Sequence, residues 1–323
     1  MDKVLIAQQT AESGIDFLKE KGYDILYVDG TDEDAFAEAV KECSAVHLGL
    51  PRMGRKVMEQ GTHLKIIARQ GTGCNNVDLQ AAEDLGIWVT NAPDATTNAV
   101  AEFTIGGLIS LAKNMYICTE KMKEGDFDSR NRYRGEDLRG KTLSIIGYGR
   151  IGRTVAKMAH FGLDMNILAY GPHLTQDKAA DYVKAVDWDT AFREGDFVSL
   201  HMPLNDSSRR SVGKREFDLM KPKAKLINMA RAAVIVENDL MEALNSGKLG
   251  GLFTDVFESE PVDKDDPLLH MDNVLVTPHM ASSSKECQAE MALFAAKQIH
   301  KVLSGEEPDT PVNHPVRPRA RIS

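Results

Sequence analysis

The amino-acid sequence predicts an α/β protein made of two consecutive series of parallel strands and helices. Short apolar runs typical of strands alternate with amphipathic segments typical of helices, and this alternation is the pattern of βαβ units in a parallel sheet. The polar stretch 124–139 interrupts the alternation, and after it the same pattern begins again. The chain has 323 residues, a length typical of about two domains.

The first series occupies the first third of the chain. Strands are expected at Val4–Ala7, Ile25–Val28, Ala45–Leu48, Lys65–Ala68 and Trp88–Thr90. Helices are expected between them at Ala11–Lys21, Asp32–Glu42 and Leu79–Leu85. The segment Asn98–Lys123 then predicts one long helix, and its small apolar residues indicate that this helix packs closely against a neighbour.

The second series begins with the apolar run 143–147. Its further strands are expected at Asn166–Tyr170, Phe197–His201, Lys225–Asn228, Gly251–Thr254 and Val274–Val276. A last helix is expected at about Ser283–Leu303, and a Pro-rich tail, 308–319, follows it. Because this tail has little apolar surface to pack by itself, we expect it to return to the first domain.

Composition excludes several classes of protein. The chain carries 39 Lys and Arg against 48 Asp and Glu, a formal net charge of −9, which gives no general attraction to nucleic acid or to an anionic membrane. Its N-terminal apolar run, 4–7, is too short for a signal peptide, and no run approaches the ~18 apolar residues of a membrane span. The four scattered cysteines indicate no metal site and a reducing compartment. We therefore expect a cytoplasmic protein without nucleic-acid or membrane partners.

A glycine-rich turn opens the second series. Gly147, Gly149 and Gly152 stand in G-x-G-x-x-G register between an apolar strand and an apolar-periodic helix. The first glycine permits a tight turn, the second lets a pyrophosphate approach the backbone, and the third allows the helix to pack on the strand. The helix N-terminus then offers free N–H groups to the phosphates. The context favours dinucleotide binding, and a purely structural glycine turn is the alternative.

One part of the dinucleotide pattern is missing. An acidic residue about 20 positions after the turn normally binds the adenosine ribose hydroxyls. Gly171 stands in that register, 19 residues after Gly152. The absent carboxylate cannot repel a 2′-phosphate, so the expected cofactor is NAD with NADP not excluded. His173 is the nearby candidate for a phosphate partner, and a plain turn glycine is the alternative interpretation of Gly171.

Three polar groups follow strands of the second series. Arg231, Glu260 and His279 each lie at or soon after the carboxyl end of an expected strand, and ligands bind at that edge of an open α/β sheet. Taken singly, each residue has an ordinary structural explanation, such as a salt bridge or a solvated loop. Together they meet the needs of hydride transfer to a 2-oxo acid. Histidine donates the proton, arginine holds the carboxylate bidentately, and a carboxylate orients the histidine.

The chain resembles the D-isomer-specific 2-hydroxyacid dehydrogenases, a family of phosphoglycerate, D-lactate and hydroxypyruvate/glyoxylate enzymes. The motifs that carry the resemblance, in order, are 64–78, 98–106, 138–152, 196–204, 219–231, 255–261 and 277–279. The resemblance implies two Rossmann-like domains, with the cofactor domain inserted into a split substrate domain. The substrate domain, of flavodoxin-like type, is then expected at 1–98 and 284–323, and the dinucleotide-binding domain at 99–283.

The resemblance also implies roles for individual residues. His279 would be the general acid/base, Glu260 its tuning partner, and Arg231 the group that binds the substrate carboxylate and carbonyl. Asp255 would contact the nicotinamide carboxamide. The expected substrate-binding residues are Thr72, Gly73, Cys74 and Arg231. The expected cofactor-binding residues are Gly147, Gly149, Arg150, Ile151, Gly152, Gly171, His173, His201, Met202, Pro203, Met229 and Asp255.

These residues predict an NAD(P)-dependent dehydrogenase that interconverts a small 2-oxo acid and a D-2-hydroxy acid. D-3-phosphoglycerate dehydrogenase is the alternative within the family. It is disfavoured because loop 47–55 lacks the family's usual arginine pattern and the chain ends soon after the last helix. A cofactor-gated binding protein of the co-repressor type is the alternative from another class. We also expect a homodimer, and we interpret the arginines at 130, 132, 134 and 139 as a solvated loop or a dimer contact.

Overall fold

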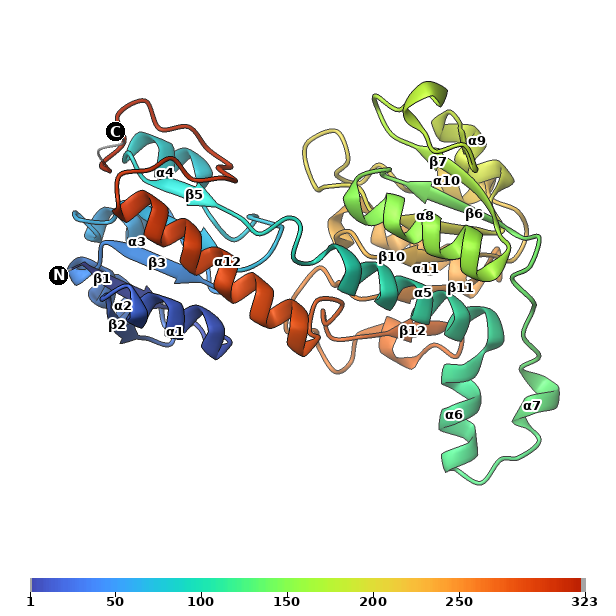
Figure 1. Ribbon diagram of the computed structural model, residues 1–323. Coiled ribbons are helices and arrows are strands. Elements are labelled where there is room, and N and C mark those ends of the chain that lie inside the picture. Colours follow the sequence, from blue (N-terminus) through green and yellow to red (C-terminus); the bar gives the residue numbers. More distant parts are fainter. Residues whose placement is uncertain (1, 321–323) are drawn as a thin grey trace. The chain divides into compact units, whose positions relative to one another are not determined.

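The chain divides into two α/β units, each with its own parallel sheet (Figure 1). Unit 1 contains residues 1–96 and 282–323, and unit 2 contains 97–281, so the second unit is inserted into the first. The computed structural model describes residues 2–320, so the first residue and the last three of the predicted substrate domain lie outside the described residues. The predicted boundaries, 99 and 283, each lie two residues beyond the observed ones.

Unit 1 is built on a five-stranded sheet in the order β2-β1-β3-β4-β5, with every neighbouring pair parallel. Its strands are β1 (Lys3–Ile6), β2 (Asp24–Tyr27), β3 (Ala45–Leu48), β4 (Ile66–Arg69) and β5 (Trp88–Thr90). Its helices are α1 (Glu12–Glu20), α2 (Glu33–Ala39), η1 (Val40–Glu42), α3 (Arg55–Gln60), α4 (Leu79–Asp84) and α12 (Lys285–Leu303). The strand order reverses between β1 and β3, as in flavodoxin-like sheets.

Unit 2 is built on a seven-stranded parallel sheet in the order β12-β11-β10-β9-β6-β7-β8. Its strands are β6 (Thr142–Ile146), β7 (Asn166–Tyr170), β8 (Val183–Ala185), β9 (Phe197–Leu200), β10 (Ala224–Asn228), β11 (Leu249–Thr254) and β12 (Val274–Val276). Its α-helices are α5 (Thr97–Lys113), α6 (Met115–Lys123), α7 (Ser129–Arg132), α8 (Arg150–Leu163), α9 (Trp188–Glu194), α10 (Lys214–Leu219) and α11 (Glu237–Asn245). Short 3-10 helices are η2 (Gln176–Lys178), η3 (Ala232–Val234) and η4 (Pro267–His270). The order reverses between β6 and β9, which makes this the Rossmann-type sheet.

The predicted α/β class is confirmed, and most expected strands lie within one or two residues of the observed ones. The reason is burial, because strands such as β3 and β9 are buried along their whole length and read as continuous apolar runs. The small residues of α5 have the expected effect. A Cβ on Gly107 would lie 1.7 Å from the Phe253 ring of β11, so the absence of a side chain at 107 lets helix and strand pack closely.

Two expectations about residues 98–139 are wrong. The single helix predicted over Asn98–Lys123 is two helices, α5 and α6, because Asn114 adopts a left-handed conformation with φ 53°. Asparagine tolerates this conformation, and its side-chain amide donates to the carbonyl oxygens of Tyr133 and Arg134. The predicted loop 124–139 contains the one-turn helix α7, and Figure 1 shows α6 and α7 projecting from the rest of unit 2.

The C-terminal tail returns to the first domain, as predicted. Pro311 forms an antiparallel bridge with Thr90 of β5. The Asn313 side chain accepts from the Val89 N–H at 2.8 Å and donates to the Ile87 carbonyl at 2.9 Å, so it replaces a neighbouring strand for β5. The tail is therefore an integral part of unit 1. In the described part of the chain, no helix combines the length and apolar character needed to span a bilayer.

Candidate active site

The glycine-rich turn joins β6 to α8 in unit 2. Gly147 has φ +103°, and a Cβ there would lie 2.6 Å from the Met202 nitrogen. A Cβ on Gly152 would lie 2.3 Å from the Gly147 carbonyl oxygen, so this glycine serves helix packing. Among the described residues, no heavy atom of a neighbour lies within 4 Å of the Cβ position of Gly149, which is the N-cap of the 14-residue helix α8. Open space therefore lies beside Gly149 at the N-cap of this helix, where a phosphate-binding turn needs room.

A cavity of about 740 Å³ lies in unit 2 at the point where the strand order reverses. The segments that follow β6, β7 and β9 line it, which is the carboxyl edge where dinucleotides bind in this kind of sheet. Of the predicted cofactor residues, the cavity is lined by Gly147, Gly149, Gly171, His173, His201, Met202 and Pro203. The others, which lie outside its lining, are Arg150, Ile151, Gly152, Met229 and Asp255. Cofactor contacts of this second group stay predictions.

The sequence analysis missed several polar and aromatic residues of the lining. They are Tyr148, Arg153, Lys178, Trp188, Asn205, Ser207, Ser208 and Ser211. Tyr148 and Arg153 lie within or next to the glycine motif, so motif spacing could have identified them. The others come from short helices and turns whose positions no periodic pattern reveals.

His201 is a partly buried histidine that lines the cavity. Its Nε2 lies 2.8 Å from the Ser199 hydroxyl oxygen, and its Nδ1 is buried with no hydrogen-bond partner among the described residues. Burial lowers the pKa of His201 to about 4, so the ring is neutral at pH 7. A neutral ring next to Met202 and Pro203 forms an uncharged wall, which suits an aromatic base better than a phosphate.

Gly171 directly follows β7, at the position where an acidic residue was expected. A Cβ there would have Leu174 Cβ at 3.4 Å as its nearest neighbour, an ordinary van der Waals contact. The backbone conformation of Gly171 also does not require glycine. The space therefore admits a side chain, and sterics do not explain the missing carboxylate. The residues present fit a dinucleotide, since cavity size, open glycine turn and helix N-terminus all occur together.

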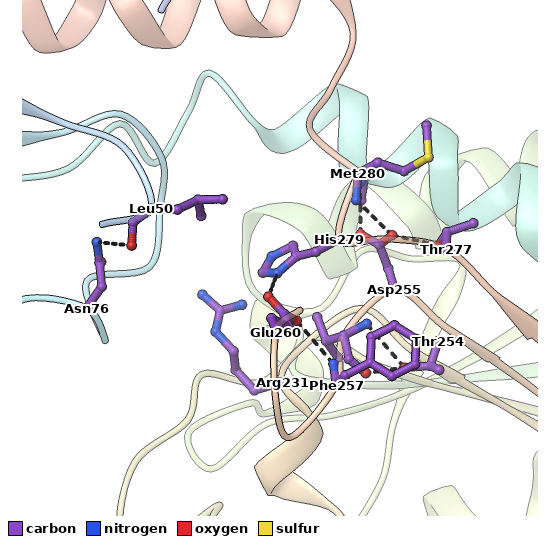
Figure 2. A network of polar contacts seen from close by, with 12 residues as sticks. Leu50, Asn76, Arg231, Thr254, Asp255, Phe257, Glu260, Thr277, His279 and Met280 are labelled. Carbon is purple, nitrogen blue, oxygen red and sulfur yellow. Dashed lines mark hydrogen bonds and ion pairs between the residues drawn. The ribbon is translucent and has the colours of Figure 1, made fainter. Parts of the chain in front are cut away.

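The three predicted catalytic residues come from three adjacent strands. Arg231 follows β10, Glu260 follows β11 and His279 follows β12, and these neighbouring strands are parallel, so their carboxyl ends share one edge. His279 Nδ1 lies 2.6 Å from Glu260 Oε2, and the Phe257 N–H donates to Glu260 Oε1 at 3.1 Å (Figure 2). The carboxylate is thus fixed on both oxygens. It turns the imidazole so that Nε2 is left for proton exchange.

The Arg231 backbone is held by a buried asparagine. Asn228, 1% exposed, donates to the Arg231 carbonyl at 3.1 Å and accepts from the Ala230 N–H at 3.0 Å. The guanidinium of Arg231 donates through Nη1 to the Ala230 carbonyl at 2.7 Å. Figure 2 shows this guanidinium extending toward the side on which Glu260 and His279 are drawn. Unit 2 therefore carries an arginine and a histidine–carboxylate pair at the same sheet edge.

Asp255 lies beneath the segment that carries His279. Its buried carboxylate accepts from the Thr277 hydroxyl at 2.6 Å, from the Met280 N–H at 2.9 Å and from the Ala281 N–H at 2.8 Å (Figure 2). His279 itself has φ 50°, so its backbone is held in a left-handed conformation. These bonds make Asp255 a positioning residue for the histidine loop. Its expected contact with a nicotinamide carboxamide stays a prediction.

The predicted substrate loop of unit 1 follows β4. The Thr72 hydroxyl lies 2.7 Å from the Thr96 hydroxyl, and the Asn91 side chain donates to the Thr72 carbonyl at 2.8 Å. The sequence analysis missed Asn76, whose side chain donates to the carbonyls of residues 49, 50 and 51 at 3.0, 3.2 and 2.8 Å (Figure 2 shows the bond to Leu50). The loop that contains Gly73 and Cys74 is therefore anchored at both ends. Carboxylate binding by its backbone stays a prediction.

Among the described residues, no group of three or more His, Cys, Asp or Glu side chains could hold a metal ion. Two arginines of the cluster after α6 form ion pairs, Arg132 with Asp126 and Arg139 with Asp164 at 3.6 Å. Arg130 stacks over the Phe127 ring at 4.4 Å. These contacts agree with the interpretation of the cluster as a solvated or contact surface.

Comparison with known proteins identifies relatives along the whole chain. The model of the D-isomer specific 2-hydroxyacid dehydrogenase NAD binding domain matches residues 105–281. A D-3-phosphoglycerate dehydrogenase of Methanocaldococcus jannaschii is 39% identical over 327 residues, covering 100% of this chain and 61% of the relative. A glyoxylate reductase of Thermococcus litoralis is 35% identical over 328 residues and covers 97% of each chain. The solved structure of a glyoxylate reductase from Paecilomyes thermophila has a TM-score of 0.87 at 27% identity, covering 96% of this chain and 98% of the other.

The relatives differ in length. This chain spans 61%, 59% and 50% of three phosphoglycerate dehydrogenases that it matches, and 97% of the Thermococcus glyoxylate reductase. The similarity itself extends over 97–100% of this chain in these four cases, so it includes both units.

Proposed function

The chain belongs to the D-isomer-specific 2-hydroxyacid dehydrogenase family, and we propose that it interconverts a small 2-oxo acid and the corresponding D-2-hydroxy acid with a nicotinamide cofactor. The observation that carries the proposal is the His279–Glu260 pair at 2.6 Å, on the same sheet edge as Arg231 and in the same unit as the nucleotide cavity. A histidine–carboxylate pair, an arginine and a dinucleotide turn supply what this reaction needs.

Each residue has a defined task in the proposed reaction. In the reducing direction a reduced nicotinamide, when bound in unit 2, would be the source of the hydride for the carbonyl carbon. His279 Nε2 gives its proton to the carbonyl oxygen, so the oxo group becomes a hydroxyl without forming a free alkoxide. Glu260 accepts the Nδ1–H and stabilises the positive charge on the ring while His279 holds the proton. Arg231 binds the substrate carboxylate by charge-assisted hydrogen bonds and polarises the carbonyl.

The cofactor would be held by unit 2. The turn Gly147–Gly152 and the N-terminus of α8 would bind the pyrophosphate, and His201–Pro203 would contact the adenine. The family model names an NAD binding domain, which supports NAD. Position 171 is glycine and lacks the carboxylate that would repel the 2′-phosphate of NADP. We therefore propose that NAD is used with weak discrimination against NADP.

The proposed substrate is a small 2-oxo acid such as glyoxylate. The match to the Thermococcus glyoxylate reductase covers 97% of both chains, which supports this choice. Phosphoglycerate is the second candidate, favoured by the 39% identity to the Methanocaldococcus enzyme. A panel that contains both substrates, assayed with NADH and NADPH in the reducing direction and NAD and NADP in the oxidising direction, distinguishes them. No detectable cofactor oxidation or reduction with any substrate of a broad panel would instead favour a cofactor-gated binding protein.

Substitution of the catalytic residues tests the proposal. His279→Ala and Arg231→Ala should each lower turnover by about 10²–10⁴-fold and leave cofactor binding nearly unchanged. His270→Ala is the matched control, because this histidine is exposed in unit 2 and its Nε2 lies 2.9 Å from the Lys264 carbonyl oxygen. Near-normal turnover in both active-site variants contradicts the proposal.

We also propose that the protein is a homodimer. The projecting segment of unit 2 carries three exposed apolar side chains, Met115, Met122 and Phe127, which are 53%, 52% and 62% exposed. Light scattering should give twice the mass of the chain. Met122→Lys with Phe127→Glu should shift the protein to monomers, whereas a monomeric parent protein contradicts the assignment.

A further inference from the structure

The end of the nucleotide cavity around Gly171 carries positive charge and no carboxylate. Arg153, Lys178 and His173 line the cavity, while no aspartate or glutamate is among the described residues that line it. An NAD-specific site of this fold places an acid at the end of the second strand, where it binds the ribose hydroxyls. Here that position is Gly171, although the space admits a side chain. This end of the cavity is therefore positively charged, whereas selectivity for NAD needs a negative charge there.

Arg153 lines the same cavity as Gly171 and is held in place by Tyr148. The guanidinium carbon lies 5.0 Å from the centroid of the Tyr148 ring, and Nε donates to the Tyr148 carbonyl at 3.2 Å. The Cβ position of Gly171 lies 3.9 Å from the Tyr148 nitrogen. The stacked tyrosine thus fixes a cavity-lining arginine that is bonded to it through Nε, which leaves the terminal nitrogens to bind a ligand.

Lys178 reaches the turn that follows Gly171. This turn is closed by the Leu174 N–H, which donates to the Gly171 carbonyl at 3.0 Å. Lys178 Nζ donates to the His173 carbonyl in the same turn at 3.5 Å. Within residues 2–320, neither Lys178 nor Arg153 forms an ion pair with a carboxylate. Two cations of the described chain therefore line the cavity together with Gly171, and neither is neutralised by an ion pair.

We infer that this end of the cavity is a subsite for a phosphate on the adenosine ribose, so that the protein accepts a 2′-phosphorylated dinucleotide, with Lys178 and Arg153 as its specificity-determining residues. The inference rests on the proposed function, because it concerns the cofactor of that same site. A phosphate accepts charge-assisted hydrogen bonds from both cations, and no nearby lining carboxylate repels it. His173 is the third group of the subsite.

Equilibrium binding without substrate tests the inference. Trp188 lines the cavity, so energy transfer from this tryptophan to NADH or NADPH reports binding, and Trp88→Phe removes the tryptophan of unit 1 as background. The parent protein should bind NADPH less than tenfold more weakly than NADH, or more tightly than NADH. Lys178→Gln should weaken NADPH about tenfold and leave NADH unchanged. Lys184→Gln is the matched control, since Lys184 lies on β8 outside the lining and pairs with Glu194.

Gly171→Asp provides the reverse experiment. A carboxylate at 171 should weaken NADPH by more than tenfold and preserve or tighten NADH binding, because it repels the phosphate and accepts from the ribose hydroxyls. A parent protein that binds NADH at least tenfold more tightly than NADPH overturns the subsite and leaves the proposed function intact. Binding of neither nucleotide contradicts the proposed function itself. Loss of NADPH and NADH binding together in Lys178→Gln, with the melting temperature unchanged, also overturns the specificity role.

Discussion

The two units share a doubly wound architecture but differ in the turn after the first strand. This turn is occupied by side chains in unit 1 and is glycine-rich and open in unit 2. In unit 1 the side chains of this turn fill its surroundings. Gln8 Oε1 accepts from the Leu50 N–H at 2.6 Å and lies 2.0 Å from where a Cβ on Gly49 would be, while Thr10 hydrogen-bonds to Gln70. In unit 2 the corresponding turn contains three glycines without side chains, and two of them, Gly147 and Gly149, line a cavity of about 740 Å³.

This difference teaches that strand order provides a place for a ligand but does not decide whether a dinucleotide binds there. Both sheets have a reversal point, between β1 and β3 and between β6 and β9. Only in unit 2 does an open glycine turn lead into a 14-residue helix, whereas α1 in unit 1 has nine residues and a turn occupied by Gln8. Function follows from the residues placed on the fold.

The largest expected effect comes from closing the glycine turn. Gly147→Ala should lower the free energy of unfolding by about 2–4 kcal/mol and abolish nucleotide binding, because φ is +103° and the new Cβ meets the Met202 backbone. Gly149→Ala is the control for folding, since its Cβ position is open and φ is −85°. Denaturant titration and NADH binding measure both. Equal stability loss in the two variants contradicts the packing argument.

Among the described residues, each unit contains one histidine whose pKa burial of the ring lowers to about 4, His47 in unit 1 and His201 in unit 2. The unfolded chain binds these protons near pH 6.5, so the folded state loses stability as the pH falls from about 6.5 to 4. The loss should reach about 3 kcal/mol for each histidine. His47→Gln and His201→Gln should each flatten this pH dependence. Trp88 in unit 1 and Trp188 in unit 2 allow the two units to be followed separately, and identical pH slopes in parent and variants contradict the prediction.

A smaller effect is expected at the catalytic histidine–carboxylate pair of unit 2. His279 and Glu260 have side chains 34% and 36% exposed, and their hydrogen bond is 2.6 Å long. Glu260→Gln keeps an acceptor for Nδ1–H but removes the charge opposite a protonated ring, so turnover should fall about 10–100-fold. The KM for the 2-oxo acid and NADH binding should change little. A large rise in KM with unchanged turnover would assign Glu260 to substrate binding instead.

The smallest effect is expected in the filled turn of unit 1. Gln8→Ala removes the bond to the Leu50 N–H and should cost about 1 kcal/mol of stability. It should give unit 1 no affinity for NADH, because neither a glycine turn nor a long helix N-terminus becomes available there. Calorimetric titration of the Gln8→Ala, Gly147→Ala double variant detects any binding by unit 1. A measurable affinity would break the comparison between the units.

The strands and the catalytic groups could be predicted from the sequence for a physical reason. Buried strands such as β3 read as continuous apolar runs, and polar groups just after them mark the ligand edge of the sheet. Other features could not be predicted from the sequence. The left-handed Asn114 lies inside an unbroken helical pattern, and β8 has three residues, too few to show a period.

The cationic end of the cavity could be predicted from sequence only in part. His173 was identified, and Arg153, which directly follows Gly152, could have been found from the spacing of the glycine motif. Lys178 reaches the turn 171–174 through irregular backbone, which neither hydrophobic periodicity nor motif spacing describes.

The split of unit 1 imposes an order on synthesis. A ribosome completes residues 97–281, all of unit 2, before it makes α12, which covers the sheet of unit 1 (Figure 1). Until then Val4, Ile6 and Ile66 lack the Ala295, Ala296 and Ile299 side chains that bury them. The second unit can therefore fold first, and the newborn N-terminal segment carries an uncovered apolar face through most of translation. Unit 1 therefore begins to be synthesised first, and its hydrophobic core is completed last.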